Sequence, residues 1–248
     1  MKLSKKILSV TGAAALSISA MATPMTAQAE TSASVAMSNM YLWRGLNLTP
    51  DGSVVSGSLD YGHESGMYAG IWTTSETGGT ETDLYVGFSG SAGDFSYDIS
   101  YWLYMYPEEL MQEAFITYPA APAAGDIIPV ETSSAFTDIS DTDISEIVAS
   151  VGYGPVAFTV YVGVDTKAVG DDDYYYYTLG YDFSKFNLTY GAWSWDKTEG
   201  ADYSHLTLSY APVDELSFAV SMASEDAKDS IEEDPIFQVT YSKSFDIK

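Results

Sequence analysis

Cysteine is absent from all 248 residues of the chain. Its absence excludes disulfide bonds, zinc sites built on thiolates and thiol catalysis. Basic residues are also scarce, since 10 Lys and Arg stand against 35 Asp and Glu, and the formal net charge is −25. Because proteins bind nucleic acids by neutralising phosphates with Lys and Arg, this balance predicts no nucleic-acid partner. It favours the attraction of cations instead.

Long apolar runs are missing too, except near the N-terminus. Lys2, Lys5 and Lys6 precede an uncharged stretch over residues 7–20, and Ala27 and Ala29 supply the small-x-small pattern of a signal-peptidase site. The stretch is shorter than the ~20 residues that a membrane-crossing helix needs. The pattern predicts a cleaved signal peptide over residues 1–29, followed by a single domain over residues 30–248.

Sustained helical periodicity is the third absence, and a two-residue alternation takes its place. The chain has 20 Tyr, 10 Phe and 5 Trp, far more than a disordered acidic chain carries. Twelve candidate segments occur, and apolar and polar residues alternate in all but the third, residues 67–73, which is apolar on both sides; over residues 95–104, for example, Phe, Tyr, Ile and Leu alternate with Ser, Asp, Trp and Tyr. Such segments predict β-strands with one apolar and one polar face.

The connections between these segments alternate in length. The short ones lie near residues 62–66, 90–94, 152–155, 182–185 and 211–215, and the long ones near 46–53, 73–81, 107–143, 166–172, 195–202 and 224–234. This alternation with an even strand count predicts an all-β fold: an up-and-down antiparallel transmembrane β-barrel of 12 strands, with short periplasmic turns and long outer loops. The longest outer loop is expected over residues 107–143. A soluble β-sandwich is the alternative, but it has no reason to alternate its connections so regularly.

A barrel in lipid places its apolar face outward and its polar face toward the lumen. Aromatic residues near strand ends are expected to form outward interfacial girdles: Tyr41, Trp43, Tyr61, Trp72, Tyr181, Tyr190 and Tyr210. The residues that parity places in the lumen, and that we predict to line a pore, are Arg44, Asp60, Asp98, Trp102, Tyr104, Tyr161, Asp165, Tyr174, Tyr176 and His205.

Arg44 is the sole arginine. We expect it on the polar face of the first strand, paired with Asp60 or another inward acid. Two interpretations stay open: the pair narrows the pore and tunes its selectivity, or it only fixes the register of the first strand. The remaining inward acids, including Asp98 and Asp165, predict a preference for cations.

Five segments resemble the TorF-like porin family, and two of them are residues 83–88 and 97–107. Residues 38–45, with the sequence S-N-M-Y-L-W-R-G, are similar to the opening of that family, residues 59–72 to its D-Y-x-H-x-S-G-x-Y-x-G-x-W stretch, and residues 242–245 to its closing S-K-S-F. The resemblance is good as far as Pro107 and thinner beyond it. It implies an outer-membrane barrel of the porin type and supplies no catalytic residues.

Enzymatic motifs are lacking. The chain has two histidines, His63 and His205, and no G-x-S-x-G elbow or glycine-rich phosphate loop, so neither catalysis nor a cofactor is expected. Acidic clusters lie in the expected outer loops, at residues 107–143, 171–173 and 224–234. Their carboxylates either bind divalent cations such as Ca²⁺ or Mg²⁺, or form a solvated acidic rim. No spacing typical of a defined metal site is present.

Taken together, these features predict a bacterial outer-membrane barrel whose partners are outer-membrane lipid and small-molecule solutes. Its expected function is that of a porin-like passive channel for small, preferably cationic or neutral, solutes. The alternative is a non-conducting barrel that acts as a structural, receptor or adhesin protein through its acidic outer loops. The sequence leaves open whether barrels associate into a homo-oligomer.

Overall fold

The computed structural model describes residues 30–50, 52–76, 79–106, 144–165, 173–196, 202–224 and 234–247. The expected signal peptide, residues 1–29, and the expected long loop, residues 107–143, lie outside these ranges, so both stay predictions. Within the described ranges, no helix is long and apolar enough to cross a membrane.

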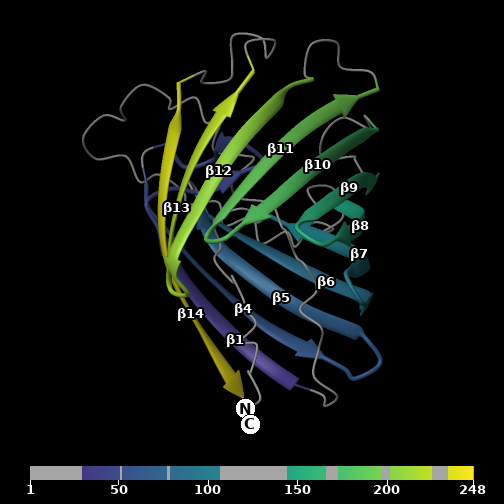
Figure 1. The fold of residues 1–248 in the computed structure, drawn as a ribbon. Helices are drawn as coiled ribbons and strands as arrows, with labels where there is room; N and C mark the ends of the chain where they lie inside the picture. The colour runs from purple at the N-terminus through teal and green to yellow at the C-terminus, as the bar shows by residue number, and fades with distance from the viewer. Residues whose placement is uncertain are drawn as a thin grey trace, which may run out of the picture.

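Twelve antiparallel strands form a closed barrel (Figure 1). The order around the wall is β1, β14, β13, β12, β11, β10, β9, β8, β7, β6, β5 and β4, and β4 returns to β1. The strands are β1 (Glu30–Ser38), β4 (Val54–Gly62), β5 (Met67–Glu76), β6 (Gly79–Ala92), β7 (Phe95–Met105), β8 (Ile144–Tyr153), β9 (Val156–Asp165), β10 (Tyr174–Phe183), β11 (Phe186–Trp195), β12 (Ser204–Val213), β13 (Leu216–Ala223) and β14 (Ile236–Ile247). The predicted fold class and strand number are confirmed.

The first strand closes the wall. Each of its residues from Thr31 to Ser38 has a partner on both sides; Val35, for example, lies opposite Lys243 of β14 and Gly57 of β4. A closed wall has no edge strand, so its backbone N–H and C=O groups bond within the sheet.

The two faces of the wall differ as the alternation predicts. Side chains such as Leu59, Val86 and Ile99 point outward and are 47%, 48% and 54% exposed, whereas the inward Ser100 and Gln238 are buried. This difference follows from the two-residue period of a strand, which sends successive side chains to opposite faces.

The aromatic girdle is only partly as predicted. Tyr61, Tyr181 and Tyr190 are exposed outward residues, whereas the inward-facing Tyr41 is only 4% exposed. The ring of Tyr41 lies 5.9 Å from that of Trp72, and both face the lumen. Trp43 also lies inside. The expectation for these three residues was wrong, because aromatic composition near a strand end does not specify the face.

The five predicted short connections are all tight turns, at residues 63–66, 93–94, 154–155, 184–185 and 214–215. They lie at one end of the barrel, called here the turn end, where β1 begins and β14 finishes with Thr31 opposite Ile247. The other end, called the loop end, holds the longer connections.

The chain leaves the wall after β1. The predicted first strand continues to Arg44, but β1 ends at Ser38, and residues 42–47 form a two-stranded hairpin of β2 (Leu42–Trp43) and β3 (Leu46–Asn47). We call residues 42–47 the lumen hairpin. Its strands pair with each other and with no wall strand. Arg44 thus belongs to a turn inside the barrel, and its expected position on the first strand was wrong.

Closure predicts a specific disulfide in this cysteine-free chain. Val35→Cys combined with Lys243→Cys should oxidise readily, because directly opposed residues in antiparallel strands place their Cα atoms about 4.5–5.5 Å apart, within disulfide range. Non-reducing electrophoresis after unfolding measures the shift in mobility. Val35→Cys with Tyr241→Cys is the control, and equal oxidation of both pairs would contradict the register.

Candidate functional site

Two residues that lead into the lumen hairpin, Asn39 and Met40, bond to β14. The Asn39 side chain bonds the β14 backbone in both directions: its Nδ2 donates to Phe237 O at 3.0 Å and its Oδ1 accepts from Val239 N at 2.7 Å. Gln238 Nε2 donates to Met40 O at 3.0 Å. These bonds replace wall pairing at the point where the chain turns inward.

The tip of the hairpin is the two-residue turn Arg44–Gly45. Both residues have positive φ angles, 48° and 88°, as a hairpin turn of type I′ requires. Gly45 is also required by space, because a Cβ atom there would lie 2.4 Å from His205 Cγ on β12. The Tyr203 hydroxyl donates to Arg44 O at 3.0 Å and holds the tip against the wall.

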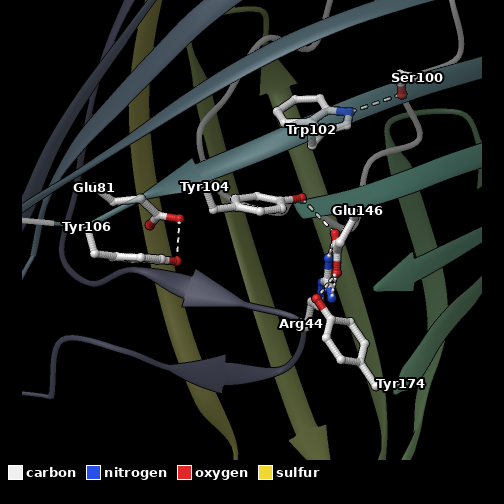
Figure 2. Close-up of polar contacts among 8 residues, drawn as sticks. All are labelled: Arg44, Glu81, Ser100, Trp102, Tyr104, Tyr106, Glu146 and Tyr174. Atoms are coloured by element: carbon white, nitrogen blue, oxygen red, sulfur yellow. Dashed lines mark hydrogen bonds and ion pairs between the residues drawn. The ribbon is translucent and has the colours of Figure 1, made fainter. Parts of the chain in front are cut away.

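The Arg44 side chain crosses the lumen to Glu146 on β8 (Figure 2). Its Nη1 and Nη2 donate to the two carboxylate oxygens at 2.9 and 2.6 Å. This bidentate pair of hydrogen bonds matches the planar geometry of the arginine guanidinium. Tyr104 and Tyr174 donate their hydroxyls to the same carboxylate, each at 2.8 Å. Arg44–Glu146 is the sole ion pair in the part of the chain that the structure describes.

Four aromatic rings surround the Arg44 guanidinium, and we call them the aromatic box. Their centroids lie 4.5 Å away for Trp43 and Tyr161, 4.6 Å for Tyr176 and 4.8 Å for Trp193. Ring faces attract cations, more strongly where water is excluded, and the Arg44 side chain is 1% exposed. The box therefore stabilises the buried charge that Glu146 neutralises.

Burial opposes the charge of Arg44, but the adjacent Glu146 carboxylate outweighs that effect and raises the pKa of Arg44 above its ordinary value. The site thus holds a permanent cation. Nearby, burial and then the negative charges of Glu81 and Asp83 raise the pKa of Tyr41, which keeps its proton.

The predicted residues nearer the turn end form separate contacts. Asp60 accepts bonds from Ser58 at 2.6 Å and from Tyr85, and it does not contact Arg44. The expected Arg44–Asp60 pair is therefore wrong, and Glu146 is the other inward acid that takes its place. Asp98 accepts a bond from Tyr68 at 2.7 Å.

The predicted aromatic residues gather around the lumen hairpin. Tyr104 and Tyr174 bond Glu146, while Tyr161 and Tyr176 belong to the aromatic box. The remaining two lie close by: the Trp102 ring stacks with Tyr104 at 6.2 Å, and His205 Nε2 lies 2.7 Å from the Tyr176 hydroxyl. Asp165 ends β9, and its side chain lies outside the described part of the structure.

A hollow adjoins the site on its turn-end side. It is small, with an accessible volume of about 30 Å³, and it lies between Arg44, Asp98, Trp102, Tyr161 and neighbouring hydroxyl residues. Toward the loop end, Glu81 and Asp83 also face inward and are at most 1% exposed. Acidic groups thus lie on both sides of the Arg44–Glu146 pair. Among the described residues, no cluster of three or more His, Cys, Asp or Glu is arranged to hold a metal ion.

The set of pore-lining residues predicted from the sequence did not include Trp193 or Tyr203, and the sequence analysis did not predict the lumen hairpin. One signal for the hairpin was present in the sequence, since Gly45 stands at the second position of a two-residue turn between Leu42–Trp43 and Leu46–Asn47. The three-dimensional contact of Gly45 with His205, 160 residues later, had no counterpart in the sequence.

Comparison with known proteins gives one family match. Residues 22–138 match a family model described as a bacterial protein of unknown function, Gcw_chp. This match, which covers a little less than half of the chain, does not confirm the TorF-like resemblance. No curated protein sequence matches the chain significantly.

Solved structures of outer-membrane barrels are similar in fold. The KdgM porin shares 8% identity with a TM-score of 0.47, over 88% of this chain and 99% of that one. The outer membrane protein OpdK from Pseudomonas aeruginosa shares 14% with a TM-score of 0.40, over 78% and 58%. Outer membrane phospholipase A from Escherichia coli shares 11% with a TM-score of 0.39, over 89% and 92%. Since these TM-scores are below 0.5, the barrel assignment rests on this chain's own strand pairing.

Gly45→Ala should destabilise the barrel, because alanine is strained at a φ of 88° and its Cβ would overlap the His205 ring. We expect a loss of about 1–3 kcal/mol in the free energy of unfolding, measured by urea titration in detergent micelles. Gly52→Ala is the matched control, because no atom lies within 4 Å of its Cβ position. Equal stability of the two variants would contradict the described turn.

Glu146→Gln should leave the Arg44 charge buried without a counter-ion. Removing one partner of a buried ion pair costs about 3–5 kcal/mol, and the same urea titration measures this. Glu64→Gln, at an exposed turn, is the control and should not change the midpoint. A small effect of Glu146→Gln would mean that the pair contributes little to the hairpin's position.

Proposed function

We propose that this chain is an outer-membrane barrel that acts as a narrow passive channel for small, preferably cationic or neutral, solutes, with the lumen hairpin as its constriction. The outer face supports the membrane location. Valine, leucine, isoleucine and phenylalanine side chains on this face are mostly 36–65% exposed around the wall, an arrangement that suits lipid and not water.

The observation that carries the proposed channel is the set of inward carboxylates on the turn-end side of the hairpin, beside the small hollow. Asp98 lines this hollow, and Asp60 lies on the same inward face nearer the turn end. Arg44, the one arginine of the chain, is already neutralised by Glu146. A lumen with carboxylates and no free positive charge among its described inward residues attracts cations and repels anions.

A second candidate function is a non-conducting barrel that works through its outer loops. The nearly complete burial of Arg44, Tyr41 and Leu42 favours it, because these side chains show that the hairpin is packed on all sides. The two candidates therefore differ in whether the constriction admits ions. Divalent-cation binding by the acidic loops and association into a homo-oligomer stay predictions, since most of the acidic loop residues lie outside the described ranges.

Conductance of the purified protein in a planar lipid bilayer tests the proposal. We expect small conductance steps with a reversal potential that indicates cation preference in a KCl gradient. Replacing residues 42–47 with Gly-Ser-Gly should raise the conductance severalfold, because it removes the packed hairpin.

Asp98→Asn should lower the cation preference of the channel, and Asp214→Asn, at an exposed turn, should not. A preference for anions would contradict the channel proposal. If neither the native protein nor the hairpin deletion conducts, the non-conducting barrel is correct.

A further inference from the structure

The wall supplies nearly every group that contacts the Arg44 guanidinium. Glu146 lies on β8, Tyr161 on β9, Tyr176 on β10 and Trp193 on β11; of the aromatic box, only Trp43 belongs to the hairpin. Tyr104 and Tyr174 hold the Glu146 carboxylate from β7 and β10. The backbone positions of these groups are therefore set by the wall and not by the hairpin.

Their chemistry is that of a receptor for a planar cation. The carboxylate accepts two parallel N–H bonds in the guanidinium plane, and the rings pack around the cation at 4.5–4.8 Å. An ammonium group lacks both the plane and the two-pronged donor geometry, so it fits such a site less well. The arrangement distinguishes one class of cation from another.

The hairpin that delivers Arg44 has no backbone ladder with the wall. Its two strands pair only with each other, and it is held by the Tyr203 hydroxyl bond to Arg44 O, by the Arg44 side chain and by the packing of Leu42, Trp43 and Leu46 against wall residues. No backbone ladder would break if the tip moved out of the box. The guanidinium of Arg44 thus occupies a site built mainly by the wall, although it belongs to a segment outside the wall.

A small hollow borders the box on the lumen side. The hollow on the turn-end side is lined by Arg44 and Tyr161 and also by Asp98 and Trp102, so it reaches the guanidinium from the lumen. The inward carboxylates raise the local concentration of cations in this space.

We propose that Glu146 and the wall rings Tyr161, Tyr176 and Trp193 form a binding site for the guanidinium group of a small solute, and that Arg44 occupies this site in the unliganded barrel. A solute guanidinium competes with Arg44 and displaces the tip of the lumen hairpin. The binding site itself is independent of conduction; only its consequence for transport rests on the proposed channel function.

Chemical complementation tests the binding site. Arg44→Gly removes the side chain and suits a φ of 48°, and the missing atoms correspond to N-propylguanidinium. This variant should bind propylguanidinium, detected by calorimetry and by tryptophan fluorescence, about tenfold or more tighter than propylammonium. Native protein should bind propylguanidinium more weakly than the variant, because Arg44 competes.

The matched control is the double variant Arg44→Gly with Glu146→Gln. It lacks both charges, so no unpaired charge is buried, and it should fold while losing propylguanidinium binding. Equal affinity of the single and double variants, or equal affinity for the two ligands, would overturn the site. Circular dichroism of each variant confirms that the β-barrel has formed.

Displacement of the hairpin is tested in the chain with native Arg44. Leu42→Cys introduces the sole thiol at a side chain that is 2% exposed, and Leu48→Cys introduces one at a side chain that is 37% exposed. Arginine amide should speed the labelling of Leu42→Cys by a polar maleimide, lysine amide should do so much less, and neither should change Leu48→Cys. Unchanged labelling of Leu42→Cys would overturn the displacement.

The two proposals fail in different ways. Binding without any conductance in bilayers would retain the guanidinium site and contradict the channel. Conductance that neither arginine amide nor Arg44→Gly alters, together with absent binding, would retain the channel and contradict the site.

Discussion

Backbone pairing along β1 is the constraint on which the rest of the structure depends. This strand bonds β14 on one side and β4 on the other, so the sheet has no edge and encloses a lumen. Closure forces each strand to present one face inward and one outward. Because β1 ends at Ser38, the loop end of the wall beside it is left to the segment that turns into the lumen.

The interior then has to accommodate a charge. Moving the Arg44 guanidinium from water into a packed lumen is costly, and the cost is offset only where a counter-ion, hydrogen bonds and polarisable rings all meet it. Glu146, its two tyrosine donors and the wall rings of the aromatic box meet these needs from five adjacent wall strands, β7 to β11. One side chain thus connects the hairpin to five of the twelve strands of the barrel.

This arrangement joins the two interpretations that the sequence left open for Arg44. The pair does hold a segment in place, but that segment is an inserted hairpin and not the first wall strand. The hairpin lies in the lumen beside a hollow lined by Asp98, so under the proposed channel function a change in its position would also change passage. Under that proposal, the structural and selective roles depend on the same two residues, Arg44 and Glu146.

The amino-acid sequence by itself determined the architecture. Its two-residue alternation and its short turn segments predict twelve strands and the facing of most of them, because these depend on local backbone geometry and on the period of a strand. It also indicated that Tyr161, Tyr176 and His205 face inward.

Only the tertiary structure decided where the chain leaves the wall and which acid pairs with Arg44. The choice between Asp60 and Glu146 depends on the lumen hairpin, whose tip is placed by contacts with residues more than 100 positions away. Parity assigns a face only while a residue stays in a wall strand. For Tyr41, Trp43 and Arg44 that condition fails, so their partners were set by the space that closure left inside the barrel.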